Sequence, residues 1–138
     1  MIGLRAICGV LFAYHLGIGL VSVLDADTTA QFATWFYGTS IRVDAQFIYV
    51  LKALGMYALF TAAVLATIIA APKRFAPLAY CVAGLQLARA CTRLVFFDIL
   101  NAGLGVDWNH NLFNAVLLII EAVLLITFAR RVQTIHSD

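Results

Sequence analysis

Four long apolar segments constrain this chain more than any other feature of its sequence. They span about 4–24, 47–71, 75–100 and 112–130. Each comes close to or exceeds the roughly 20 residues that a helix needs to cross the hydrocarbon core of a bilayer. A bilayer accepts only helices or closed barrels, and no segment alternates as a barrel strand does. We therefore expect an all-α integral membrane four-helix bundle.

The composition supports a membrane protein. Apolar residues make up 64% of the 138 residues and charged residues 12%, whereas a soluble domain is about half apolar and a quarter charged. The formal net charge is only +2, and no basic patch suggests a nucleic-acid partner. We expect residues 1–138 to form one transmembrane domain whose partners include membrane lipids.

Basic residues near the segment ends predict the orientation. They lie before the first segment, in the loop "APKRFAP" and after the last segment, at Arg5, Lys73, Arg74, Arg130 and Arg131. With four spans, these three regions fall on the same side of the membrane. Because cytoplasmic loops carry the excess of Lys and Arg, we expect a multi-pass protein of the inner (plasma) membrane with both termini in the cytoplasm.

The segment boundaries carry further signals. Pro72 and Pro77 bracket the central loop, and we expect them to stop the helices on either side. "VLDADTT" is a poor signal-peptidase site, so we expect 4–24 to remain as a span. In the first outer loop, Asp27 or Thr28 is expected to cap a short interfacial helix. That helix is either an aromatic anchor or a lid over a site.

Small residues recur at steps of four in two segments and predict close helix packing. The first set is Gly9, Ala13 and Gly17, and the second is Ala58, Ala62, Ala66 and Ala70. Ridges of small side chains let helix backbones approach closely in lipid. We expect both ridges to form helix seams, either within this chain or with another one.

The stretch "LQLARACTRLVFFDIL", residues 85–100, is apolar enough for lipid and yet carries Arg89 and Arg93. Gln86 shares the face of these arginines, because the three residues are spaced by three and four. Counted from the outer ends of their spans, Arg89 and Glu121 lie at similar depths of roughly 15 Å. We therefore predict that Arg89 pairs with Glu121 inside the bundle.

The polar layer has more positive than negative groups. Glu121 is its one deep carboxylate, and Asp98 lies nearer the surface. A partner subunit's carboxylate, an anionic or electron-rich ligand, or a Lys52 that reaches the outer headgroups would each restore the balance. The layer either ties helices together or forms a binding site. The candidate ligand-binding residues are His15, Lys52, Arg89, Arg93, Asn114 and Glu121.

The second outer loop, "NAGLGVDWNHN", places Asp107 and His110 three residues apart. Two mixed ligands do not make a metal site, so we expect no metal. Asn109 or Asn111 is expected to cap the last helix, and Asp107 and His110 are candidates for the mouth of a pocket.

The order of four stretches resembles the DoxX-like superfamily of small four-helix membrane proteins. These stretches are "RAICGVLFAYHLGIGL", "LKALGMYALFTAAVLA", "LQLARACTRLVFFD" and "NAVLLIIEAVLLITFA". In that group an arginine-bearing third helix and a glutamate in the fourth helix recur, and Arg89, Arg93 and Glu121 match them. The resemblance implies a small accessory subunit, in some relatives one that belongs to a quinone-linked oxidoreductase assembly.

We therefore expect a non-catalytic accessory subunit that packs against a larger membrane complex, or against its own copies, or that holds a lipophilic ligand such as a quinone or lipid. The alternative is a small membrane enzyme, an isomerase or quinone-linked oxidoreductase that acts on a hydrophobic substrate. In that alternative the catalytic candidates are Glu121 and His15, which would move protons while the arginines stabilise negative charge.

Overall fold

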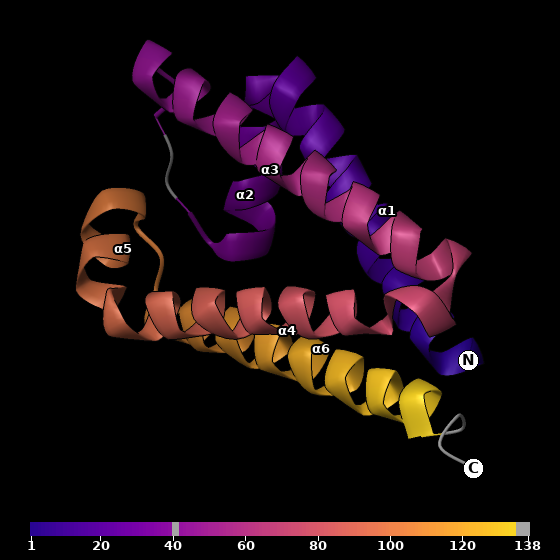
Figure 1. Cartoon of the computed structure of the whole chain (residues 1–138). Helices are drawn as coiled ribbons and strands as arrows, with labels where there is room; N and C mark the ends of the chain where they lie inside the picture. The colour runs from indigo at the N-terminus through magenta and orange to yellow at the C-terminus, as the bar shows by residue number, and fades with distance from the viewer. Residues whose placement is uncertain (40–41, 135–138) are drawn as a thin grey trace.

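The computed structural model describes residues 1–39 and 42–134 and is largely helical there. The expected all-α fold is confirmed, and this part of the chain forms six helices (Figure 1). Their bounds are α1 (Ile2–Leu24), α2 (Ala26–Tyr37), α3 (Ala45–Ala70), α4 (Pro72–Val95), α5 (Phe97–Leu104) and α6 (Trp108–Thr134).

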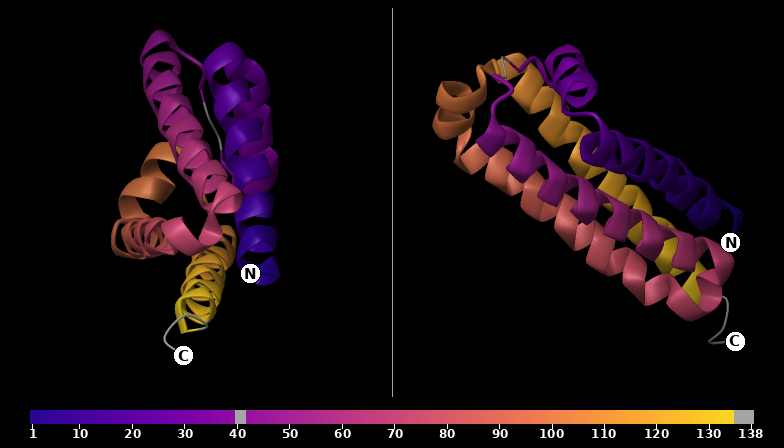
Figure 2. Two further views of the ribbon diagram at one scale, coloured as in Figure 1. Left: turned by 45° about the vertical axis from the view of Figure 1, so that its right-hand side comes forward. Right: turned by 90° about the horizontal axis from the view of Figure 1, so that it is seen from above.

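The four long helices form two antiparallel pairs. α1 lies along α3, and α4 lies along α6 (Figures 1 and 2). A single residue, Ala71, joins α3 to α4. The pairs meet at the end that holds the N-terminus and diverge toward the other end, where α2 and α5 lie (Figure 1). The described chain is therefore V-shaped, with a closed end and an open end.

The apolar core fills the closed end. All four long helices contribute fully buried side chains to it, among them Leu4, Leu65, Ile68, Ala76 and Leu125. At the same end, Nε of Arg5 donates a hydrogen bond to the Ile69 carbonyl at 3.2 Å, which ties the start of α1 to the end of α3. The closed end is packed solid, so any internal space lies toward the open end.

The small-residue ridge predicted on the first segment is not an internal seam. Ala13 and Gly17 are exposed, and a Cβ added at Gly9 or Gly17 would meet nothing within 4 Å. α1 and α3 instead approach closely at Gly19 and Gly55, where each added Cβ would come within 3.1 Å of the other residue's carbonyl oxygen. A stripe of small residues on an apolar helix can face outward as readily as inward, so the step of four alone does not identify the seam.

The alanine ridge of α3 is only partly internal. Ala62 is buried, Ala58 and Ala66 are partly buried, and Ala70 is exposed. It therefore contributes to packing without forming a continuous seam.

The prediction of one helix over 75–100 is wrong. The helix ends at Val95, Phe96 forms a turn, and α5 begins at Phe97. Arg93 lies in the last turn of α4 and Asp98 in the first turn of α5. The positive Arg93 thus complements the dipole at the C-terminal end of α4, and the negative Asp98 complements the dipole at the N-terminal end of α5.

The two prolines do not bracket a loop, as the sequence had indicated. Pro72 is the first residue of α4, where its missing N–H costs no helical hydrogen bond, and Pro77 lies inside that helix. Pro77 leaves the Lys73 carbonyl without its helical partner one turn earlier. The connection between the pairs is therefore a sharp corner.

In the described residues, three helices are long and apolar enough to cross a membrane by length and composition: α1, α3 and α6. The sequence predicted four spans. α4 is also long, but it carries Lys73, Arg74, Arg89 and Arg93. Length and composition therefore support a membrane protein, and α4 differs from the other three long helices in its charge.

The surface of the long helices is apolar, while several polar side chains are buried. Large hydrophobic residues that are exposed include Val10, Phe60, Leu94, Ile120 and Val123. The buried polar residues include His15, Thr61, Gln86, Asn111 and Asn114. Water would penalise so much exposed apolar surface, whereas lipid would not. This distribution also suggests a membrane environment.

Candidate functional site

A partly open cavity of about 550 Å³ lies at the open end, between the two helical pairs. Its wall combines residues of α1, α2, α3, α4 and α5 with Thr39 and Val106 from the connecting segments. Most of the lining is apolar, for example Ile18, Leu51 and Leu100. We call this space the large cavity. Its volume lies within the roughly 300–1,000 Å³ of small-molecule sites, and its mix of an apolar wall with few polar groups is typical of them.

A second space of about 250 Å³ lies between α1, α2, α4 and α6. We call it the small cavity. Tyr14, Phe32, Arg89 and Arg93 line both cavities. The two arginines therefore stand in a shared wall, within reach of a molecule in either space.

Helix α2 forms part of that wall. Asp25 caps it, because one carboxylate oxygen accepts hydrogen bonds from the backbone N–H groups of Asp27 and Thr28 at 3.1 Å. The predicted caps, Asp27 and Thr28, are thus wrong by a few residues. Phe32 of α2 lines both cavities, and the helix lies between the diverging pairs (Figure 1). The aromatic residues of this helix bear on both alternatives, because Phe32 lines the two cavities whereas Trp35 is 77% exposed.

The Asp25 carboxylate is well satisfied at this helix start. It accepts a further hydrogen bond from the Thr28 hydroxyl at 2.6 Å. That hydroxyl and the backbone N–H groups of Thr28 and Asp27 hold the pKa of Asp25 below its ordinary value. The charged form of Asp25 is therefore the form that stabilises α2.

The end of α2 rests on the start of α6. Gly38 follows α2 with a φ of 65°, a left-handed conformation that favours glycine. The His110 ring lies so close that an added Cβ at Gly38 would come within 2.9 Å of its Cγ. His110 also lines a shallow pocket with Trp35 and Phe36. This contact helps to fix α2 between the two helical pairs.

Asp107, rather than Asn109 or Asn111, caps α6. One carboxylate oxygen accepts from the backbone N–H of Asn109 at 2.8 Å and of His110 at 3.1 Å, and the other pairs with Nδ1 of His110. The His110 ring and these N–H groups lower the pKa of Asp107. Asn111 instead donates to the Arg93 carbonyl at 3.0 Å, which joins α6 to the end of α4.

The predicted pairing of Arg89 with Glu121 is indirect in the structure. Among residues 1–39 and 42–134 these two side chains form no direct ion pair. Gln86 lies between them: Nη1 of Arg89 donates to Oε1 of Gln86 at 3.0 Å, and Nε2 of Gln86 donates to Oε2 of Glu121 at 2.5 Å. The Gln86 side-chain amide thus bridges Arg89 on α4 and Glu121 on α6 through two hydrogen bonds.

The two cavities differ in charge. Glu121 and Asn114 line the small cavity, whereas no Asp or Glu contributes to the described lining of the large one. The charged side chains in the described lining of the large cavity are therefore the two cations Arg89 and Arg93. A molecule with a negative or electron-rich group would be attracted to this wall.

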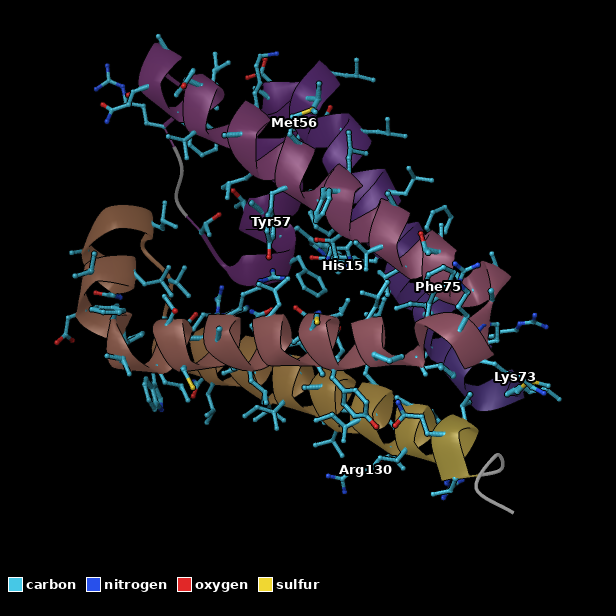
Figure 3. The ribbon with its side chains drawn as sticks, in the orientation of Figure 1. His15, Met56, Tyr57, Lys73, Phe75 and Arg130 are labelled. Carbon is cyan, nitrogen blue, oxygen red and sulfur yellow. The ribbon has the colours of Figure 1, made fainter. Side chains whose placement is uncertain are left out.

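His15 lies in the wall of the large cavity, in the space between the helical pairs (Figure 3). It is only 3% exposed. Its Nδ1 lies 2.9 Å from the Leu11 carbonyl oxygen, one turn back in α1. Its Nε2 is buried and has no hydrogen-bond partner among the described residues. His15 and Glu121 line different cavities, so the geometry does not bring the two catalytic candidates together.

Lys52 does not join the polar layer. Its side chain is exposed, and its Nζ donates to the Val23 carbonyl at 2.9 Å, near the end of α1. The depth of a residue along a helix does not determine the face on which its side chain lies. Of the six predicted ligand-binding residues, His15, Arg89 and Arg93 line the large cavity, and Asn114 and Glu121 line the small one with the same arginines.

Sequence reasoning missed three hydroxyl residues of the large cavity. Ser22, Thr29 and Thr39 line it and are at least nine-tenths buried. The Thr29 hydroxyl donates to the Asp25 carbonyl at 2.8 Å, whereas the Thr39 hydroxyl has no partner within the described part of the chain. A lone Ser or Thr at the end of an apolar segment carries no pattern that would have marked it.

The comparisons with known proteins returned no match of any kind: no family model, no curated protein and no solved structure. In the described residues, no group of three or more His, Cys, Asp or Glu side chains is placed to hold a metal ion.

Proposed function

We propose that this protein is an integral membrane accessory subunit that binds a lipophilic molecule in the large cavity. The observation that carries the proposal is the cavity itself: an apolar space between two helical pairs whose polar lining includes Arg89, Arg93 and His15. Such a site suits a molecule with an apolar body and an electron-rich head group, such as a quinone or a lipid.

We further propose that α4 crosses the membrane beside α6, so that the chain has four spans. The protein would then lie in the inner (plasma) membrane with both termini in the cytoplasm. α4 directs Gln86 inward and Arg89 toward the cavities, while Leu87 and Leu94 are exposed. This distribution removes most of the cost of placing its arginines in lipid. With this topology the open end faces the outer side.

Binding rather than catalysis is the proposed role. A proton-moving enzyme would bring Glu121 and His15 to the same substrate, but they line separate cavities. Glu121 is also engaged by Gln86. The proposal agrees with the role that the resemblance to the DoxX-like superfamily implies.

The partner of such a subunit would contact an outward face. The ridge at Gly9, Ala13 and Gly17, of which Ala13 and Gly17 are exposed, supports an association with another membrane protein or a second copy, because small residues allow close helix approach in lipid. Purification in mild detergent should then recover partner chains or an oligomer. A lone monomer under those conditions would count against the accessory role.

The binding proposal is tested by extracting the purified protein with organic solvent and identifying the released molecules by mass spectrometry. We expect a stoichiometric lipophilic molecule from the wild type. Arg89→Gln with Arg93→Gln should reduce its retention by about tenfold or more, since a charge-assisted hydrogen bond contributes about 1.5–3 kcal/mol.

Arg130→Gln is the matched control, because Arg130 is exposed on α6 at a distance from the cavities (Figure 3). It should retain the molecule as the wild type does. Circular dichroism and size exclusion verify that each variant folds. If the double variant retains as much of the lipophilic molecule as the wild type does, the proposal is wrong.

A further inference from the structure

The two ends of the molecule carry opposite charges. The aspartates of the described chain all lie at the open end, at Asp25, Asp27, Asp44, Asp98 and Asp107. The closed end has no described Asp or Glu, and its exposed basic residues are Arg5, Lys73, Arg74, Arg130 and Arg131. Asp138, which follows α6 in the sequence, lies outside the described residues. The described surface of the closed end is therefore positive.

These basic residues come from three helices that pack on one core. Each lies within three residues of a buried member of that core, namely Leu4 of α1, Ala76 of α4 or Val132 of α6. Lys73 lies at the closed end, and the side chain of Arg130 points away from it (Figure 3). We call Arg5, Lys73, Arg74 and Arg131 the basic cluster.

Two guanidinium groups of the basic cluster lie over aromatic rings. Cζ of Arg74 is 5.2 Å from the ring centroid of Phe75, and Cζ of Arg131 is 5.8 Å from that of Phe128. Both rings pack against the apolar core. A guanidinium over a ring is attracted by the negative face of the ring and keeps its N–H donors at its own edges. Those edges match the oxygens of a phosphate group.

Lys73 and Arg74 occupy positions where the helix itself disfavours positive charge. They are the second and third residues of α4, at the positive end of the helix dipole. No acidic residue lies in this first turn, no side chain caps it, and no described carboxylate forms an ion pair with either residue. An anion from outside the described chain would offset this pair of charges.

The other members of the basic cluster have favourable positions within the fold. Nε of Arg5 bonds the Ile69 carbonyl near the end of α3, and Arg131 lies in the last turn of α6, where the dipole favours a cation. Local structure therefore explains these two arginines, and it leaves the charges at the start of α4 unexplained.

We propose that the basic cluster binds the phosphate of an anionic phospholipid in the cytoplasmic leaflet. Under the proposed topology the closed end faces the cytoplasm, and that leaflet carries anionic lipids. The exposed apolar surface of the long helices can contact the acyl chains of such a lipid, which neither inorganic phosphate nor an acidic peptide has. This inference goes beyond the proposed function, because it concerns the end opposite the cavities.

Two lipids with the same acyl chains test the inference. Dioleoylphosphatidylglycerol is anionic, whereas dioleoylphosphatidylcholine has no net charge. The full chain in detergent micelles is given an equal mixture of both, and native mass spectrometry counts the bound lipids. We expect the wild type to prefer phosphatidylglycerol by about tenfold, because each nearby Lys or Arg contributes about fivefold. A preference near one would overturn the inference.

The double variant Lys73→Gln with Arg74→Gln should retain a preference of about twofold or less. The control, Arg42→Gln with Lys52→Gln, removes the same charge from exposed residues at the open end. It should keep the preference of the wild type. An equal fall in both double variants would show that net charge alone sets the preference, which would contradict the inference.

A stability measurement separates lipid binding from misfolding. The Lys73 and Arg74 substitutions remove charges that oppose the dipole of α4, so in phosphatidylcholine nanodiscs the variant should unfold at the wild-type temperature or above it. Adding phosphatidylglycerol should raise the unfolding temperature of the wild type and not that of the variant. Raising NaCl from about 0.05 M to about 0.5 M should weaken the effect. Equal stabilisation of both proteins would overturn the inference.

Two competitors distinguish the lipid from other anions. Glycerophosphoglycerol, the same head group without acyl chains, should not displace phosphatidylglycerol at equal concentration. Displacement by it would show that the phosphate group alone suffices. A polyglutamate peptide that binds more tightly than the lipid would indicate an acidic protein partner. Either result would overturn the lipid assignment. An empty large cavity would instead contradict only the proposed function.

Discussion

At the scale of single residues, Gln86 is the side chain that connects the charged groups of α4 and α6. It is 1% exposed and bonds both Arg89 and Glu121. Its amide has one donor end and one acceptor end, so it can serve a carboxylate and a guanidinium at the same time. Without Gln86, Arg89 and Glu121 would remain partly buried, and each would lose a hydrogen bond.

Replacing Gln86 with leucine should therefore destabilise the protein. We expect a loss of about 1–3 kcal/mol in the free energy of unfolding, because buried polar groups are left unsatisfied. The measurement is denaturant unfolding in detergent followed by circular dichroism. Gln31→Leu is the control, since Gln31 is exposed on α2 and should change stability by less than about 0.5 kcal/mol. Equal stabilities for the two variants would argue against the link.

The sequence could predict which side chains share a helix face but not which ones meet. The spacing of Gln86, Arg89 and Arg93 correctly placed them together, because helical periodicity is local. The pairing of Arg89 with Glu121 also required the rotation and register of α4 against α6. Counting residues from an assumed boundary does not give these, and that boundary moved when the helix ended at Val95.

At the scale of elements, the start of α2 is stabilised by its N-cap residue, Asp25. Asp25 is the acceptor for three hydrogen bonds from Asp27 and Thr28. The lowered pKa of its carboxyl means that the folded state favours the charged form. The cap is therefore fully effective above the ordinary pKa of 3.8, and it is lost as the pH falls through the lower folded-state value.

We expect the Thr28 amide proton to report this titration. Its NMR chemical shift should stay constant from neutral pH down to the ordinary pKa and should then change with a midpoint below 3.8. In Asp25→Ser the hydroxyl still caps but does not titrate, so the same resonance should show no such step. A midpoint at or above the ordinary value would show that the cap is not formed.

The crossing of α1 and α3 is a second property at this scale. Gly19→Ala should destabilise the protein by about 1–3 kcal/mol, since the new Cβ would press on Leu59 and on the Gly55 carbonyl. Gly17→Ala adds the same methyl group where nothing lies within 4 Å. It should be neutral or stabilise by up to about 1 kcal/mol, because alanine favours helix more than glycine. Thermal unfolding of the two variants checks the difference, and a reversed order would contradict the packing.

Helices were easier to predict than their junctions. The segments expected at 4–24, 47–71 and 112–130 correspond to α1, α3 and α6 with ends shifted by up to four residues. Continuous hydrophobicity marks such helices strongly. The turn at Phe96 lies within an apolar stretch without glycine or proline, so composition gave no warning of it. The positions of α2 and α5 depend on contacts with distant segments and could not be read locally.

At the scale of the whole molecule, the exposed apolar surface and the buried polar groups agree with the membrane setting inferred from composition. Three crossings would leave the N-terminus and the end of α6 on opposite sides of the membrane, whereas four crossings leave them on the same side.

We expect four crossings, and labelling of introduced cysteines from outside intact cells tests this. In a background with the native cysteines replaced by serine, a cysteine at Lys73 should be protected from an impermeant maleimide and one at Asn109 should react. Both positions are exposed in connecting or terminal turns. A cysteine at Arg130 should be protected as Lys73 is. Labelling at Arg130 but not at Asn109 would indicate an inverted last helix and three crossings.

Because Ala71 alone joins α3 to α4, the angle between these two helices sets how far apart their distant ends lie. α3 has 26 residues and is about 39 Å long at ~1.5 Å per residue. A change of one degree in the angle at the corner therefore moves the far tips by roughly 0.7 Å. The side chains packed at the closed end, such as Ile68 and Ala76, thus affect the width of the open end, although they lie far from it.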